Sequence, residues 1–432
     1  MVKFHSIIKI SEICNVSQKT IRRQIASGKL KACRIGNQWR IEENDFNDWI
    51  NPENHNDIKE QIGALQYSLF NEPVEISRKK ETRRHSTNNT NKNDDVNWID
   101  ISDVWEKQFG KPYTYVDLFS GAGGLSRGLD LAGFRGILAV EFERTAVETY
   151  RYNFDHPVID RDIREPETKQ EAYRLIKESI GDNSVDLICG GFPCQGFSMS
   201  GYRVVEDKRN SLYQEMLEII DRLKPKFVLM ENVVGLRSML HGKVEEKILN
   251  DLREMGYTVN VTVLNSADYH VPQVRNRVIF IGNKVDKMNH HPLPLLTPEH
   301  YKTTNDAIGD MMSHPEDKVF NHEASRHSLG MQERLMSVPE GKSLYANYSD
   351  AWKKCPWDKP SCTIKENHGG VNIHPKLPRV LTVREMARLQ SFPDDFIFRG
   401  AKKWQQVQVG NAVPPFLGKA VGLAIRKSLE EE

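Results

Sequence analysis

Residues 117–124 read Asp-Leu-Phe-Ser-Gly-Ala-Gly-Gly, directly after an apolar run, Tyr113–Val116, that is typical of a buried strand. A strand that turns through glycines into a helix brings backbone N–H groups and the helix N-terminus toward a polar or anionic ligand. Gly121, Gly123 and Gly124 permit an approach that a Cβ would block. The pattern suits a nicotinamide, flavin or S-adenosylmethionine site, and it indicates a doubly wound α/β sheet.

The regular alternation of strand-like and helical segments from Tyr113 to Asn283 predicts the same α/β architecture. Acidic residues stand at two of the strand ends. Glu141 ends the second strand, a common position for binding a ribose, and Asp162 follows the third, where it could accept from an adenine amino group. The expected strands are 113–119, 135–141, 157–160, 185–189, 226–230, 257–264 and 276–282.

Two further strand ends carry reactive side chains. The run Val185–Ile188 leads into Cys-Gly-Gly-Phe-Pro-Cys-Gln, which places Cys189 in the strand and Cys194 on a loop, and Glu231 follows Phe227–Met230. A thiolate on a loop can act as a nucleophile, and a carboxylic acid at a neighbouring strand end can assist it as a general acid. A buried thiol and a helix N-terminal carboxylate are the plainer alternatives, but the joint occurrence of Cys194 and Glu231 favours an enzyme.

Together these motifs resemble the DNA (cytosine-5)-methyltransferases over about residues 113–424, in the order of that family. Three more stretches carry the resemblance: 273–277, 379–393 and 408–415. It implies a Rossmann-like, S-adenosylmethionine-dependent catalytic domain with a smaller target recognition lobe. It also implies that the target cytosine is flipped out of duplex DNA into the active site.

The resemblance implies the following cofactor site. Phe119 would stack on the adenine, Glu141 would bind the ribose, and Asp162 with Ile163 would hold the adenine edge. Arg161 stands where the family usually has glycine, which weakens only the expectation of a local turn. Asn411 and Val413 would lie near the methionine end of the cofactor. The full expected set is Phe119, Gly121, Gly123, Gly124, Glu141, Asp162, Ile163, Pro193, Asn411 and Val413.

The resemblance also implies roles in catalysis and DNA contact. The catalytic set is Cys194, Glu231, Arg275 and Arg277. Arg277 would contact the 2-oxo group of the cytosine and Arg275 would brace the active-site loop, although a salt-bridged edge strand would show the same Arg-x-Arg. Residues 196–212 resemble the loop that closes over DNA. Gln195 and Ser198 would contact the DNA, with Ser198 reaching a phosphate.

Residues 284–375 break the α/β rhythm and would form the target recognition lobe, and 376–432 would return to the catalytic domain of 113–283. Arg, Lys, Asn and Gln on loops are suited to reading bases in the major groove. The unranked candidates are Arg326, Gln332, Arg334, Lys365, Asn367 and His368. The histidines of this segment lack paired metal-ligand spacing, so we expect no metal.

Residues 1–50 resemble the small winged helix-turn-helix of excisionase and MerR-like modules. Two helical segments precede a predicted hairpin over 30–41. Residues 1–50 contain nine Lys/Arg and five Asp/Glu, and this excess of positive charge suits a phosphate-facing surface. Gln18, Lys19, Arg22 and Arg23 would face the major groove, although protein contacts remain an alternative. Residues 51–112 are predicted to be a largely flexible linker, with periodicity returning at 98–105.

Composition adds only broad limits. The chain has 432 residues, a net charge of +1, and six scattered cysteines without Cys-x-x-Cys spacing, which are expected to be reduced thiols. No apolar run approaches the ~18 residues of a membrane helix. We expect a cytoplasmic, nucleoid-associated bacterial enzyme, monomeric on double-stranded DNA, with a cognate restriction endonuclease acting separately. The alternatives are a helix-turn-helix regulator with secondary methylation and a tRNA cytosine-5 methyltransferase.

Overall fold

The computed structural model describes residues 4–6, 10, 21, 25, 30–35, 38–42, 45–46, 96–109, 113–193, 210–345, 352–365 and 371–431. The chain divides into two compact units, Met1–Arg84 and His85–Glu432, which are considered separately. No helix in the described part of the chain is long and apolar enough to cross a membrane.

The N-terminal unit contains a three-stranded antiparallel sheet of order β1-β3-β2, formed by Phe4–Ser6, Gln38–Glu42 and Cys33–Ile35. The pairing of β2 with β3 confirms the predicted hairpin. The pairing of β1 with β3 was not predicted. Among the residues of this unit that the structure describes, Ile10, Ile21, Leu30, Ile41 and Phe46 form a buried hydrophobic cluster. Gln18, Lys19, Arg22 and Arg23 lie outside the described residues.

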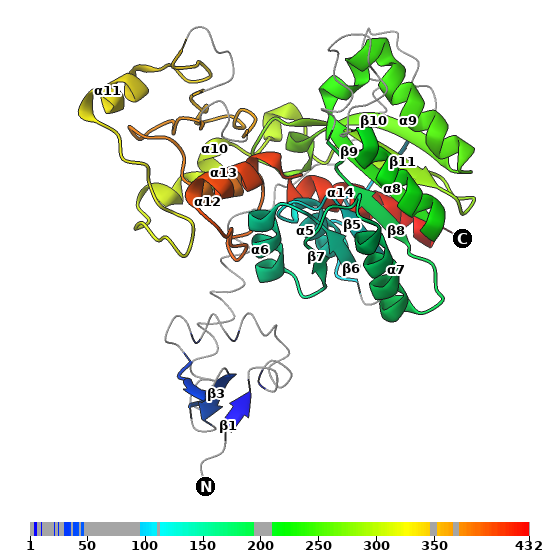
Figure 1. Ribbon diagram of the computed structural model, residues 1–432. Coiled ribbons are helices and arrows are strands. Elements are labelled where there is room, and N and C mark those ends of the chain that lie inside the picture. Colours follow the sequence, from blue (N-terminus) through cyan, green and yellow to red (C-terminus); the bar gives the residue numbers. More distant parts are fainter. Residues whose placement is uncertain are drawn as a thin grey trace. The chain divides into compact units, whose positions relative to one another are not determined.

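The larger unit is built on a seven-stranded sheet of order β10-β11-β9-β8-β5-β6-β7 (Figure 1). The strands from β5 to β9 are parallel, and β10 and β11 add an antiparallel edge. All seven predicted strands are present, because parallel strands buried on both faces read as apolar runs. Their bounds are β5 Tyr113–Leu118, β6 Phe134–Val140, β7 Val158–Ile159, β8 Leu187–Gly190, β9 Phe227–Val233, β10 Thr258–Asn265 and β11 Asn276–Asn283.

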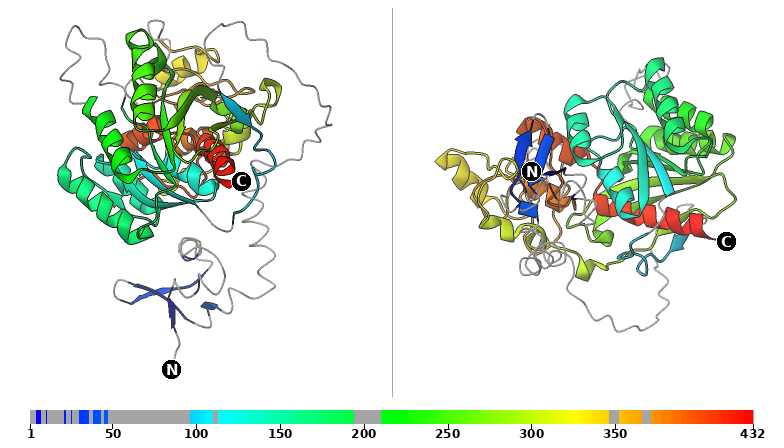
Figure 2. Two further views of the ribbon diagram at one scale, coloured as in Figure 1. Left: turned by 90° about the vertical axis from the view of Figure 1, so that its right-hand side faces the viewer. Right: turned by 90° about the horizontal axis from the view of Figure 1, so that it is seen from below.

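Helices cover both faces of this sheet (Figures 1 and 2). One face packs against α7 Pro166–Ile180, α8 Asn210–Leu223 and α9 Lys243–Glu254. The other packs against α5 Gly124–Leu131 and α14 Pro415–Glu430. The chain order of the strands reverses between β5 and β8, so the carboxyl ends of these two strands form a topological switch point, the usual ligand position in such sheets.

The last helix, α14, packs closely on α5, which begins at the glycine-rich turn. A Cβ at Gly128 would lie 2.4 Å from the carbonyl oxygen of Pro415, and one at Gly418 would lie 3.2 Å from the Cα of Gly128. Glycine at both positions therefore lets the two backbones approach. The final helix also packs beside the first strand of the sheet, since Tyr115 of β5 and Leu417 of α14 share one core cluster.

The remaining elements form a smaller lobe and the connections to it. The helices α10 Thr304–Ile308, α12 Val383–Leu389 and α13 Lys402–Asn411 share a core with α6 Arg144–Asn153, and α11 Leu329–Ser337 packs in a separate cluster. Arg384 of α12 is fully buried and donates to the carbonyl oxygens of Phe320 and Phe396 at 3.0 and 2.7 Å. Within the described ranges, four segments have 3₁₀ geometry: η2 Val234–Gly242, which is interrupted by a kink, η3 Ser266–Tyr269, η4 Pro298–His300 and η5 Asp310–Met312.

A two-stranded parallel sheet joins β4 Asn97–Ile99 to β12 His290–Pro292. Residues Ile101, Val104 and Trp105, where periodicity returned in the sequence, are buried in the core cluster that contains α14. Residues 97–105 and 290–292 thus pack with the larger unit, although they belong to the segments that were assigned to the linker and the recognition lobe.

Candidate active site

The glycine-rich turn after β5 has an unusual backbone. Phe119, Gly121 and Gly123 have φ values of 60°, 54° and 95°. Positive φ is uncommon for a residue with a side chain, and such conformations concentrate at functional sites. A Cβ at Gly123 would lie 2.3 Å from the Phe154 ring, whereas nothing lies within 4 Å of the same position at Gly121. Gly123 is therefore required by packing, and only Gly121 borders open space.

Gly124 has a packing role too. A Cβ there would lie 2.3 Å from the carbonyl oxygen of Val413. The predicted motif 408–415 thus lies against the glycine-rich turn, although about 290 residues separate the two in sequence. Val413 is buried and Asn411 is exposed at the last residue of α13. Close approach of a ligand was the expected reason for all three glycines, and of the three only Gly121 has open space at its Cβ position.

Glu141 follows β6 and lies beside the same turn. Its carboxylate accepts from the backbone N–H groups of Gly121, Phe142 and Glu143 at 2.8, 2.9 and 2.8 Å. Burial raises the pKa of Glu141, while these three donors oppose that shift. A carboxylate offers about four acceptor positions, so one remains for a ligand. Phe142, the next residue, is 67% exposed beside this carboxylate and was not among the site residues expected from the sequence. Its position as an aromatic residue directly after a strand-end acid could have marked it as a candidate ligand contact.

Asp162 and Ile163 follow β7. Ile163 is buried. The Nε of Arg164 lies 3.0 Å from each carboxylate oxygen of Asp162, and this hydrogen bonding lowers the pKa of Asp162. Arg161 forms an ion pair with Glu171 on α7. The carboxylate of Asp162 is thus already engaged by a neighbouring guanidinium.

A buried ion pair connects β9 to β11. The Nε of Arg277 lies 2.6 Å from Oε1 of Glu231, and both side chains are close to nine-tenths buried. Glu231 lies within β9 rather than at a helix N-terminus. A Cβ at Gly191 would lie 3.0 Å from Oε2 of Glu231, so the segment after β8 passes directly beside this carboxylate.

The segment after β8 is also tied to β9 by a hydrogen bond. The side-chain amide of Asn232 donates to the carbonyl oxygen of Phe192 at 2.9 Å. Pro193, which comes next, is the last described residue before Cys194. Cys194, Gln195 and Ser198 lie outside the described residues. Cys189 is fully buried in β8, as predicted.

Arg275 precedes β11 and is almost completely buried. Its guanidinium donates to the carbonyl oxygens of Ile364, Gly410 and Ala412 at 2.8, 2.8 and 3.1 Å. Burial lowers the pKa of Arg275 well below the usual value. The residue therefore joins the start of β11, the segment 352–365 and the end of α13.

The sequence of residues 113–427 matches the family of C-5 cytosine-specific DNA methylases. The chain belongs to this family. Residues 6–53 match a helix-turn-helix domain. The methylase is a DNA (cytosine-5-)-methyltransferase, and its glycine-rich turn, Glu231 and Arg277 all fall within the matched region.

Curated relatives support the assignment. Type II methyltransferase M1.HphI of Haemophilus parahaemolyticus is 42% identical over 330 residues, which cover 73% of this chain and 87% of that protein. Type II methyltransferase M.DdeI of Desulfomicrobium norvegicum is 34% identical over 71% of this chain and 86% of its own length. Type II methyltransferase M.Eco47II of Escherichia coli is 30% identical and covers 99% of this chain and 96% of itself, so that similarity extends into the N-terminal unit.

Solved structures share the fold. A protein described as a DNA modification methyltransferase encoded within an Escherichia coli prophage is 26% identical, with a TM-score of 0.58, and covers 74% of this chain and 100% of its own. The methyltransferase EhMeth of Entamoeba histolytica has a TM-score of 0.55 at 17% identity, with the same coverage of both chains. The latter similarity concerns the fold alone.

The candidate base-reading residues of the methylase have different surroundings. Arg326 is exposed and pairs with Glu316 at 3.0 Å. Gln332 donates to the carbonyl oxygen of His327 at 2.9 Å, and Arg334 lies over the ring of Tyr345. Lys365 is among the described residues, and Asn367 and His368 are not.

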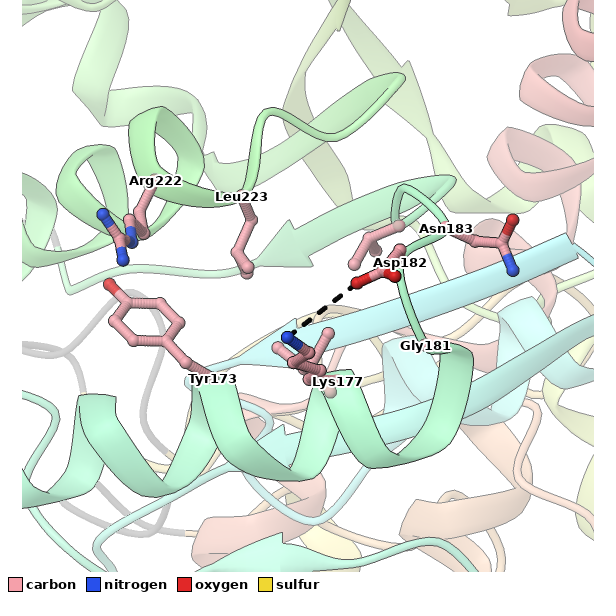
Figure 3. A pocket seen from close by; sticks show the side chains of 9 residues that line it. Tyr173, Lys177, Gly181, Asp182, Asn183, Arg222 and Leu223 are labelled. Carbon is pink, nitrogen blue, oxygen red and sulfur yellow. Dashed lines mark ion pairs between the residues drawn. The ribbon is translucent and has the colours of Figure 1, made fainter.

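The methylase also has a pocket between α7 and α8 (Figure 3). It is lined by Tyr173 and Lys177 of α7, by Asp182, and by Arg222 of α8. Lys177 and Asp182 form an ion pair of 3.8 Å across it. The lining residues precede the amino ends of β8 and β9, whereas Pro193 and Glu231 lie toward the carboxyl ends of these strands. This pocket therefore lies at the opposite edge of the sheet from Pro193 and Glu231.

Proposed function

We propose that the methylase transfers a methyl group from S-adenosylmethionine to carbon 5 of a cytosine within a short duplex DNA sequence, through a covalent adduct with Cys194. The observation that carries this proposal is the buried Glu231–Arg277 ion pair of 2.6 Å beside the strand end that leads to Cys194. An acid, a guanidinium and a thiol at neighbouring strand ends are the groups that attack at carbon 6 requires.

The residues around the glycine-rich turn fit S-adenosylmethionine. The hydroxyl of Ser120 is buried without a hydrogen-bond partner among the described residues, Gly121 borders open space, and Glu141 retains acceptor capacity. When bound, this cofactor supplies an electrophilic methyl group. The residues proposed to hold it are Phe119, Gly121, Gly123, Gly124, Glu141, Asp162, Ile163, Pro193, Asn411 and Val413.

Each catalytic residue has a distinct role in the proposal. The Cys194 thiolate bonds to carbon 6 of the flipped cytosine, and Glu231, in its protonated form, donates a hydrogen bond to ring nitrogen 3 as the ring gains electron density. Arg277 contacts the 2-oxo group and positions Glu231 through their ion pair. Arg275 is a positioning residue through its three carbonyl contacts. After methylation a base removes the proton on carbon 5, and Cys194 leaves as thiolate.

The proposed contacts of the methylase with DNA are supported by its membership of the DNA methylase family. Gln195 and Ser198 would contact DNA near the flipped base, and the lobe of residues 284–375 would read the sequence. We propose that the methylase acts as a monomer on double-stranded DNA in the bacterial cytoplasm, near the nucleoid. The names of its relatives as type II methyltransferases support a separately acting restriction endonuclease as its counterpart.

Bisulfite sequencing of plasmid DNA from cells that express the chain tests the reaction. We expect protected cytosines in one short sequence, with protection lost in Cys194→Ala and kept in Cys33→Ala, which alters a thiol in the other unit. Absence of protection with folded wild-type protein would contradict the proposal. A parallel assay with tRNA would then test the tRNA alternative.

A second proposed function concerns the N-terminal unit. The helix-turn-helix match over 6–53 favours DNA binding, with Gln18, Lys19, Arg22 and Arg23 at the major groove. Binding of the gene's own upstream DNA would make the chain a regulator as well as an enzyme. Gel shifts with the full chain should show a preference for that DNA that Arg22→Ala/Arg23→Ala abolishes while methylation persists. Equal binding by both proteins would remove this idea.

A further inference from the structure

Two cysteines of the segment 352–365 lie unexpectedly close together. The sulfur atoms of Cys355 and Cys362 are 3.7 Å apart. Cys355 is fully buried and Cys362 is half-buried. A disulfide has an S–S length of about 2.0 Å, so a bond requires the two sulfurs to approach by about 1.7 Å. A loop of only six residues separates the two cysteines.

The surroundings distinguish the two thiols. The side-chain amide of Asn372 lies 3.1 Å from the sulfur of Cys362. Hydrogen bonding from the Cys355 thiol, together with the charge of Lys353, lowers the pKa of Cys362. The same hydrogen bond and burial raise the pKa of Cys355. Cys362 is thus the more nucleophilic and more accessible sulfur, and Cys355 is placed behind it as its partner.

A metal site is a weaker explanation of the same pair. Soft metals in proteins usually take three or four Cys or His ligands. Among the described residues, no group of three or more His, Cys, Asp or Glu side chains is arranged to hold a metal ion. Two thiols without a third ligand suit redox chemistry, because a low-pKa thiol beside a resolving thiol is the usual arrangement of a redox-sensitive pair.

We propose that Cys355 and Cys362 form a reversible intramolecular disulfide when the protein meets a peroxide. The Cys362 thiolate attacks one peroxide oxygen, forming a sulfenic acid and releasing hydroxide. The Cys355 sulfur then bonds to the Cys362 sulfur and displaces the hydroxyl, which leaves as water with the Cys355 proton. The hydroxide of the first step takes up the proton that Cys362 released on ionising. Two thiols are oxidised to one disulfide, and one hydrogen peroxide is reduced to two waters.

The disulfide would form at a junction that also holds Arg275. The backbone N–H of Ser361 donates to the carbonyl oxygen of Pro272 at 2.9 Å, and Val274 donates back to Ser361 at 3.0 Å. The carbonyl oxygen of Ile364 accepts a hydrogen bond from the guanidinium of Arg275 at 2.8 Å. Residues 361–364, which include Cys362, are therefore hydrogen-bonded to the segment that leads into β11 and Arg277. Disulfide formation at Cys362 therefore disturbs the hydrogen bonds that join residues 361–364 to residues 272–275.

Peptide mass spectrometry tests the proposal at the two residues themselves. The full chain is treated with hydrogen peroxide, quenched with catalase, alkylated and digested with trypsin. Because Pro360 follows Lys359, trypsin leaves residues 355–365 as one peptide that contains both cysteines. We expect this peptide to lose two hydrogen atoms in mass and to resist alkylation, and dithiothreitol to restore two alkylation sites.

Single substitutions test the assignment of the two sulfurs. Cys355→Ser should leave a sulfenic acid at Cys362 that a dimedone probe traps, whereas Cys362→Ser should leave Cys355 unmodified. Cys189, fully buried in β8, is the internal control and should remain reduced. Full alkylation of both cysteines after peroxide, or a dimedone adduct on Cys355 instead of Cys362, would overturn the proposal. Thermal melts of each variant check that it is folded.

Discussion

If the guanidinium of Arg277 is removed, Glu231 remains a mostly buried carboxylate that has lost this ion-pair partner. We expect Arg277→Ala to lower kcat/KM by about 10²-fold or more, as for loss of one preorganised transition-state donor. Methylation kinetics measure the effect, with thermal melts to check folding. Arg237, which pairs with Glu245 at 2.6 Å near the following helix, offers a matched ion pair. Equal losses in Arg277→Ala and Arg237→Ala would contradict a specific role for Arg277.

The two glycines Gly121 and Gly124 should respond differently to alanine. Gly124→Ala forces a Cβ toward the Val413 carbonyl oxygen at 2.3 Å, so we expect a lower melting temperature and lost activity. Gly121→Ala meets open space and carries only the backbone strain of a positive φ, about 1 kcal/mol. It should remain folded and raise KM for S-adenosylmethionine. A normal KM in Gly121→Ala would argue against cofactor binding there.

Strand β12 carries a histidine with consequences for acid stability. Burial lowers the pKa of His291 to about 3, and neither ring nitrogen has a partner among the described residues. The unfolded state binds a proton near pH 6.5 and the native state does not. The stability from His291 is therefore fully present above pH 6.5 and is lost as pH falls toward 3, by about 2 kcal/mol at pH 5.

His291→Phe should remove this dependence. Urea unfolding at pH 7 and pH 5 should show a smaller loss for the variant than for the wild type, by about 2 kcal/mol. Burial raises the pKa of Asp117 to about 7, so Asp117 destabilises the native state as pH rises from about 4 to 7. That contribution is common to both proteins and cancels in the comparison. Parallel pH profiles would refute the assignment to His291.

The packing of α5 on α14 makes a prediction about helix glycines. In Gly128→Ala a Cβ would lie 2.4 Å from the carbonyl oxygen of Pro415, so we expect destabilisation above about 1 kcal/mol. Gly330 of α11 has nothing within 4 Å of its Cβ position. Gly330→Ala should be neutral or stabilising by up to about 1 kcal/mol. Urea unfolding distinguishes them, and equal effects would mean that the helix contact is looser than described.

Elements were easier to predict than the contacts between them. The strands of the sheet and the position of Glu141 directly after β6 follow from local apolar runs, whereas β9 continues past the predicted end at residue 230 and includes Glu231. The packing roles of Gly123 and Gly124 did not, because the atoms that they meet belong to Phe154 and Val413. Likewise, nothing near Arg275 in sequence indicates Ile364 or Gly410. Contacts of high sequence separation leave no local periodicity to read.

At the scale of the whole molecule, the two units divide the proposed functions. The unit His85–Glu432 has its own cores and contains every proposed catalytic and cofactor residue. A chain that lacks residues 1–84 should therefore methylate the same sequence as the full chain. Bisulfite sequencing with both proteins measures this. Lost methylation in a folded truncated protein would show that the N-terminal unit contributes to the reaction.

The contact of Val413 with Gly124 also sets an order of events during synthesis. At about 5–20 residues per second, a ribosome adds Val413 about 15–60 s after Gly124. During that interval the apolar side chains of α5, including Leu125 and Leu129, lack the α14 partners that bury them in the finished protein. The glycine-rich turn is thus among the first parts of its sheet to be translated and among the last to be completed. A nascent methylase therefore lacks a finished version of the proposed cofactor site until α14 has been made.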